Sequence, residues 1–171
     1  TLFTVNSPDL TKNTLGVRSF IQQLSYAVSD GTIAIVGTLD GNVQYGFNLG
    51  QGVANSATWV NVTDSNAVLP NRPIMDVATH PTIPTIGFAA IGGFDENTPT
   101  TPGNVYQVTC NSNCSSFTWE DKTGNLPNIP ANSIIANPNI PEQVFVGTDW
   151  GLYYTNDVTA VTPTWNLFTA G

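Results

Sequence analysis

Short apolar segments alternate along this chain with polar turns rich in Asn, Gly and Pro. Runs such as 33–36, 86–90 and 144–146 contain β-branched residues and are too short for ordinary helices. Gly or Pro residues end most of these runs, as is typical of strands that lead into tight turns. The pattern therefore predicts an all-β chain.

Several landmarks recur in one order, which indicates an internal repeat. A Thr-Trp pair occurs three times, each time after a polar loop, and its tryptophans are Trp59, Trp119 and Trp165. After the first two pairs come Leu-Pro and then a Pro-x-x-Pro turn, at 80–84 (HPTIP) and 137–141 (NPNIP). A Gly-Thr-x-x-Gly turn recurs at 37–41 and 147–151.

Each repeat describes four short antiparallel strands over roughly 45–60 residues, which is the plan of a β-propeller blade. One blade cannot bury its own faces, so we expect the repeated tryptophans to lie between neighbouring blades. We place a partial blade at 1–23 and full blades at 24–63, 64–123 and 124–168. The second full blade carries an insertion at 92–102. In the partial blade, Leu2–Asn6 and Thr14–Phe20 are expected to be the third and fourth strands.

The fold expected is thus about three and a half blades, fewer than the four to eight of a closed propeller. An open arc exposes an apolar face and strand edges. We therefore expect another protein chain, or further blades, to complete the ring.

The segments Val144–Thr148, Gly151–Thr155 and Thr164-Trp165 together resemble the sialidase-type, or Asp-box, propeller repeat. The similarity covers about 30–168 and is nearest to xyloglucanase-like and sortilin-like propellers. In that family a Ser/Thr-x-Asp-x-Gly-x-Thr-Trp hairpin joins the third and fourth strands. Here Thr155-Asn156-Asp157 begins a stretched version, and the hairpin at 109–119 has Asn in place of Asp. The resemblance implies a propeller fold but no particular activity, because this hairpin is structural.

Charge narrows the range of partners. Four basic and 12 acidic residues give a net charge of −8, which repels phosphate backbones and anionic lipids. No apolar run approaches the roughly 18 residues of a membrane span. We therefore expect no nucleic acid partner and no membrane insertion, whereas a neutral glycan, a cation or another protein remains open.

Two cysteines, Cys110 and Cys114, enclose three residues, and this spacing suits a small loop closed by a disulfide. A disulfide favours an oxidising compartment, so we expect a secreted or periplasmic location. Asn61 and Asn113 begin glycosylation sequons, whose use depends on the source of the protein.

The candidates for catalysis are few. Sialidase chemistry requires three arginines, and the chain has only Arg18 and Arg72. Glycosidases of the xyloglucanase type require two carboxylates across a cleft. Their candidates here are carboxylates in turns, where ordinary turn chemistry explains them equally well. They are Asp40, Asp149, Asp95 and Glu96.

The sequence also contains candidates for two kinds of ligand contact. Trp150 replaces Asp40 at the recurring Gly-Thr-x-x-Gly turn, so it could stack on a sugar ring while Asp149 binds hydroxyl groups. Hard oxygen donors suited to Ca²⁺ occur in two pairs, Asp40 with Asn42 and Asp95 with Asn97, without the full spacing of a calcium loop. No other cofactor is expected.

The function favoured by the sequence is an extracellular recognition or structural module that binds carbohydrate or protein. Two alternatives remain. One is a fragment of a secreted, xyloglucanase-like glycoside hydrolase, which predicts two carboxylates roughly 5–10 Å apart in a cleft. The other is a self-assembling extracellular protein, which predicts end strands completed by another chain.

Overall fold

The computed structural model describes residues 7–51 and 57–169, which form three separate four-stranded antiparallel sheets. The first contains β1 (Ile21–Ala27), β2 (Asp30–Thr38), β3 (Val43–Phe47) and β4 (Thr58–Asn61). The second contains β5 (Ile74–Thr79), β6 (Ile86–Ile91), β7 (Val105–Asn111) and β8 (Ser116–Asp121). The third contains β9 (Ala131–Ala136), β10 (Val144–Thr148), β11 (Gly151–Thr155) and β12 (Asn166–Leu167).

The helical content of the described residues is limited to three single turns of 3₁₀-helix: η1 (Gly16–Arg18), η2 (Asp64–Asn66) and η3 (Asp95–Asn97). None of these segments is a long apolar helix of the kind that crosses a bilayer. The expectation of an all-β chain is confirmed.

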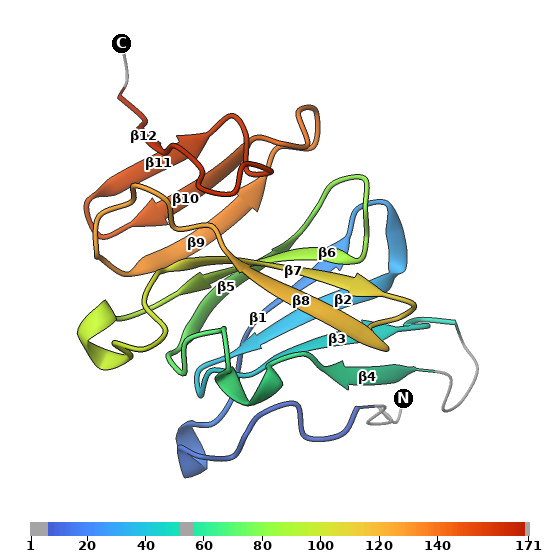
Figure 1. Cartoon of the computed structure of the whole chain (residues 1–171). Helices are drawn as coiled ribbons and strands as arrows, with labels where there is room; N and C mark the ends of the chain where they lie inside the picture. Colours follow the sequence, from blue (N-terminus) through green and yellow to red (C-terminus); the bar gives the residue numbers. More distant parts are fainter. Residues whose placement is uncertain (1–6, 52–56, 170–171) are drawn as a thin grey trace.

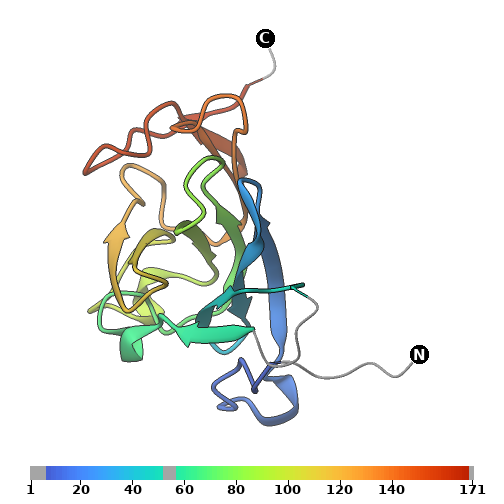
Figure 2. The same cartoon turned by 90° about the vertical axis from the view of Figure 1, so that its right-hand side faces the viewer.

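The three sheets lie face to face, with the second between the first and the third (Figure 1). The first strand of the second sheet, β5, contacts both β1 and β9, so these three strands form the shared inner side of the stack. Figure 2 shows the same stack turned by 90°. The second sheet, in the middle of the stack, is therefore covered on both faces, as a repeat of stacked blades requires.

Two apolar clusters fill the spaces between the sheets. Ile35 and Tyr45 of the first sheet, with Val62 just beyond β4, pack with Val77 and Val108 of the second sheet. The second cluster joins the opposite face of the second sheet to the third, through Phe88, Val105, Ile134, Val146 and Trp165. Burial of this apolar surface between the sheets, at about 25 cal/mol per Å², holds the stack together.

The repeated tryptophans join neighbouring sheets by hydrogen bonds as well as by packing. Trp119 Nε1 on β8 donates to Val62 O, just beyond β4, at 2.6 Å. Trp165 Nε1 donates in the same way to Lys122 O, just beyond β8, at 2.9 Å. The half-buried Trp59 indole of the first sheet donates to no acceptor among the described residues. Each bond therefore crosses from one sheet to the end of the sheet before it.

A second recurring device closes the first and second sheets at their outer strands. Thr63 N donates to Asn61 Oδ1 at 2.9 Å, and Thr63 Oγ1 accepts a hydrogen bond from Val43 N at 2.8 Å. The second sheet repeats this arrangement: Thr123 N donates to Asp121 Oδ1 at 2.8 Å, and Thr123 Oγ1 accepts from the N–H groups at the start of β7. We call this Asp/Asn-x-Thr unit the strand-end clasp.

The first of these two hydrogen bonds also occurs once before the first sheet. Thr11 N donates to Asp9 Oδ1 at 2.9 Å, and Leu10 between them is buried. The fourth strand expected at Thr14–Phe20 is wrong, because these residues belong to no strand and follow the Asp9–Thr11 turn instead of preceding it. Residues 14–20 form a connection that contains η1, where Gly16 has a φ of +57°. Leu2–Asn6 lies outside the described residues.

The disulfide between Cys110 and Cys114 is confirmed, and it closes the tip of the hairpin between β7 and β8. The two Cα atoms are 4.5 Å apart. The residues between them turn sharply, since Ser112 and Asn113 both have positive φ angles. The cystine thus holds a turn that left-handed backbone conformations make costly.

Candidate functional site

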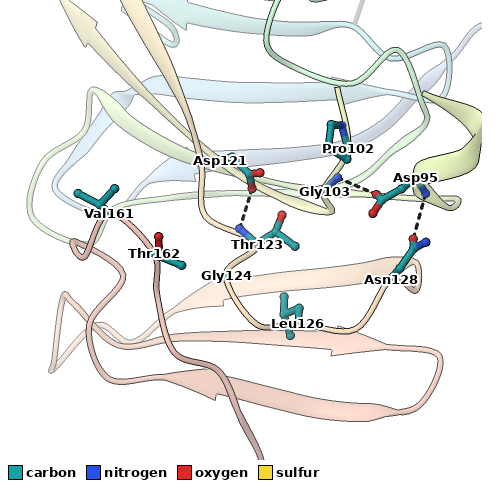
Figure 3. Close-up of a pocket in the computed structure, with 10 residues that line it drawn as sticks. All are labelled: Asp95, Pro102, Gly103, Asp121, Thr123, Gly124, Leu126, Asn128, Val161 and Thr162. Carbon is teal, nitrogen blue, oxygen red and sulfur yellow. Dashed lines mark hydrogen bonds between the residues drawn. The ribbon is translucent and has the colours of Figure 1, made fainter. Parts of the chain in front are cut away.

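A cavity of about 490 Å³ opens at the junction of the second and third sheets (Figure 3). It is built from the loop between β6 and β7, the connection from β8 to β9, and the loop before β12. Its lining combines carboxylates, amide and hydroxyl groups with apolar side chains: Asp95, Pro102, Gly103, Asp121, Thr123, Gly124, Leu126, Asn128, Val161 and Thr162. We call it the interblade pocket.

Asp95 lies at one end of the pocket, and the 92–102 insertion places it there. Its Oδ1 accepts a hydrogen bond from Gly103 N at 2.7 Å, which ties the two ends of the loop together. Asp95 N donates to Asn128 Oδ1 at 2.9 Å, across to the connection that precedes β9. The buried guanidinium of Arg72 lies 3.6 Å from the Asp95 carboxylate and also donates to Gly103 O. Asp95 is therefore a fixed, charge-compensated carboxylate.

Asp121 supplies a second carboxylate from the end of β8. Its Oδ1 accepts the clasp hydrogen bond from Thr123 N, and the side chain is exposed in the pocket (Figure 3). Gly103 lies between the two carboxylates. A Cβ at Gly103 would be 3.1 Å from both oxygens of Asp121 and 2.6 Å from Thr123 Oγ1, and its φ is +100°. Only glycine fits there.

Asp40 lies in the β2–β3 turn of the first sheet, which corresponds to the β6–β7 loop that carries Asp95. Its carboxylate, however, is already engaged by hydrogen bonds within the chain. It is only 6% exposed and accepts hydrogen bonds from Thr38 Oγ1 at 2.6 Å and Lys12 N at 3.0 Å. Burial by itself would raise the pKa of Asp40, but these bonds, with those from Ser19 and Thr14, hold the pKa below its usual value. Asp40 is therefore a structural anchor for the segment that precedes β1.

The structure does not bring the predicted carboxylates together as a pair. Asp40 belongs to the first sheet and Asp149 to the third, with the second sheet between them. Asp149 lies in the turn between β10 and β11, where its Oδ1 accepts a hydrogen bond from Asn132 Nδ2 at 2.7 Å. Beside it, Trp150 is 70% exposed. Glu96 is near the interblade pocket and is held by Asn128 Nδ2 at 3.2 Å.

The oxygen donors considered for Ca²⁺ have other partners. The Asn42 side chain donates to Leu10 O at 2.6 Å, and its Oδ1 accepts from Thr63 Oγ1 at 2.6 Å. Asn97 Oδ1 accepts a hydrogen bond from Phe94 N at 3.1 Å. Over residues 7–51 and 57–169, no three carboxylate, histidine or cysteine side chains gather as a metal site would require.

Asp121 is the residue of the pocket that sequence reasoning missed. It follows Trp119 at the end of a strand, where an exposed acidic residue is unremarkable. The signal that could have revealed it is the clasp itself, because Asp121-x-Thr123 aligns with Asn61-x-Thr63 two residues after a tryptophan.

Comparison with solved structures shows the fold. An ancestral GH74 enzyme is similar over 88% of this chain, with a TM-score of 0.55 and 18% identity. The β-propeller domain of Cps50 (Swd1) from Myceliophteria thermophila is also similar over 88% of the chain, with a TM-score of 0.55 and 13% identity. This chain spans 18% of the first protein and 43% of the second.

No model of a protein family and no curated protein matches the sequence. The similarity to these two solved structures shows that the three sheets are blades of a β-propeller. The chain corresponds to only part of each of those two proteins.

Proposed function

We propose that this chain is an extracellular β-propeller recognition module whose interblade pocket binds a neutral carbohydrate. The observation that carries the proposal is the pocket of about 490 Å³ between the second and third blades, in which two carboxylates face Gly103. Concave sites that combine a few fixed polar groups with apolar walls are the usual form of small-ligand sites.

The polar groups of the pocket suit sugar hydroxyls. Carboxylate oxygens of Asp95 and Asp121 accept hydrogen bonds from hydroxyl groups, and such charge-assisted bonds are stronger than neutral ones. The side chains of Leu126 and Val161 offer apolar surface for the C–H faces of a ring. The net charge of −8 favours a neutral ligand over an acidic one.

Trp150 and Asp149 supply a second proposed contact. The exposed indole stands at the β10–β11 turn, and turns between the second and third strands of every blade lie at one end of the sheets. A sugar stacked on Trp150 could hydrogen bond to Asp149, which Asn132 holds in place.

Hydrolysis is the second candidate, because two carboxylates near one another are the requirement of a glycosidase. One solved structure of similar fold is a GH74 enzyme, which shows the fold alone at 18% identity. The Asp95 carboxylate faces the Arg72 guanidinium and accepts a backbone N–H. That environment suits a fixed acceptor better than a proton donor, so we favour binding.

The repeat type and the location belong to the same proposal. The Asp157 loop supports an Asp-box-like repeat, because Asp157 Oδ1 accepts hydrogen bonds from Thr159 N at 2.9 Å and Ala160 N at 3.2 Å. The cystine supports an oxidising, extracellular compartment.

The test is calorimetric titration of the chain with soluble xyloglucan-derived, cello- and manno-oligosaccharides. Asp121→Asn is the informative variant, because Asn61 already performs the same clasp in the first blade, so the fold is retained. We expect this change to weaken binding about tenfold or more, from the loss of a charged acceptor. Glu142→Gln, which removes an exposed carboxylate elsewhere, is the matched control and should bind normally.

The assignment of the pocket would be contradicted if the Asp121→Asn variant bound every sugar as tightly as the unchanged chain does. It would also be contradicted if the unchanged chain bound none of the oligosaccharides. Release of reducing ends during incubation, lost in Asp121→Asn, would instead establish the hydrolase.

A further inference from the structure

The outward face of the third blade carries a cluster of aromatic side chains. Phe145, Tyr154 and Phe168 lie with ring centroids 6.0 to 6.4 Å apart. Phe168 is 54% exposed, and Ile135 beside them is 62% exposed. Among the described residues nothing covers this face, which we call the end face.

The end face repeats two faces that are covered elsewhere in the molecule. In the third blade, Phe145 of β10 stands opposite Ile135 and Tyr154 in the ladder. In the first blade the matching residue Ile35 stands opposite Tyr45, and both are fully buried against the second blade. In the second blade the matching Phe88 is fully buried against the third blade.

A backbone acceptor repeats together with these side chains. Val62 N donates to Val43 O at 3.0 Å, Lys122 N to Val105 O at 2.8 Å, and Phe168 N to Leu152 O at 2.7 Å. These bonds place Val62, Lys122 and Phe168 at one position of the repeat. The carbonyls of Val62 and Lys122 accept the tryptophan N–H of the following blade. The carbonyl of Phe168 accepts no hydrogen bond within residues 7–51 and 57–169.

We propose that the end face docks a further four-stranded blade of this repeat, whose tryptophan donates its indole N–H to Phe168 O. A partner that merely extended the sheet would add to the edge strand β12 and leave the end face open. A stacked blade covers the whole face, as it does at the two interfaces inside the chain.

The chain also indicates what this blade must carry. Tyr45 of the first blade meets Gly87 of the second, where an added Cβ would be only 2.5 Å from the tyrosine Oη. Tyr154 occupies the Tyr45 position on the end face. The docking blade should therefore have glycine on its second strand, together with a tryptophan two residues before its clasp. The second blade of this chain has both features, in Gly87 and Trp119.

The second blade thus serves as the probe. The chain is extended after residue 169 with a second copy of residues 64–123, a natural junction because Thr169 matches Thr63 in the repeat. If the copy docks, its Trp119 indole proton is protected from exchange and its loops resist protease. The variant Phe168→Asp should speed cleavage of the appended copy about tenfold or more without exposing the resident blades, because an aspartate cannot be buried there unpaired.

Leu167→Asp is the matched control, because Asp occupies this position in the second blade and the side chain does not belong to the end face. It should leave cleavage unchanged, and the milder Phe168→Ala should give an intermediate rate. Equal cleavage of the appended copy with and without Phe168→Asp would overturn the proposal. So would a copy that is digested at once while two unextended chains associate through Phe168, since a second chain would then be the occupant.

Discussion

The hydrogen bond from Trp119 to Val62 O should contribute much of the coupling between the first two blades. Trp119→Phe keeps an aromatic ring on β8 but removes the donor, and leaves a buried carbonyl without its partner. An unsatisfied buried acceptor costs about 1–3 kcal/mol, and the lost ring atoms add about 1 kcal/mol of packing. We therefore expect a loss of about 2–4 kcal/mol in the free energy of unfolding.

Trp59→Phe is the internal comparison. Trp59 holds the same repeat position in the first blade, but it is only half-buried and its indole has no acceptor among the described residues. Its loss should cost about 1 kcal/mol or less.

The assay is urea unfolding followed by circular dichroism. With a slope of about 1–3 kcal/mol per molar urea, Trp119→Phe should lower the midpoint by about 1–2 M. Midpoints that fall equally in both variants would refute the view that these indoles join successive blades.

Two further predictions concern packing and pH. Gly87→Ala should destabilise the chain by about 1–3 kcal/mol, because the new Cβ would clash with Tyr45, whereas Gly31→Ala, with open space around it, should have little effect; thermal unfolding compares the two. The pKa of Asp40 is lower in the folded chain than its ordinary value of about 3.9. The stabilisation of the folded chain by the Asp40 carboxylate is therefore present at neutral pH and is lost as the pH falls below about 4. Asp40→Asn should reduce the loss of stability between about pH 5 and 2, and an unchanged acid profile would contradict this role.

The fold was accessible from the sequence because the constraints on a blade are local. A tryptophan between sheets, prolines that cannot join a ladder, and glycines in tight turns leave marks at nearly fixed spacing. The phase of the first segment was missed for the opposite reason. The first position of the clasp is Asn61 in the first blade and Asp121 in the second, and the matching position of the third blade is Leu167, so no single residue type marks the end of a fourth strand.

The candidate site was less predictable than the fold. Asp40 and Asp95 look alike as acidic residues in turns, yet the first is sealed by the segment before β1 and the second borders a pocket. That difference depends on which loop packs over each turn. Contacts between loops that are far apart along the chain produce no periodic pattern in the sequence. The interblade pocket exists only because two blades and the 92–102 insertion meet there.

Hydrogen exchange of the four indole protons, followed by NMR, tests the stacking of the blades most directly. Trp119 and Trp165 donate to carbonyls of the preceding blade, so their protons should exchange only as slowly as the chain unfolds. The exposed Trp150 should exchange within the dead time of the measurement. Exchange of the Trp119 and Trp165 protons as fast as that of Trp150 would contradict the account.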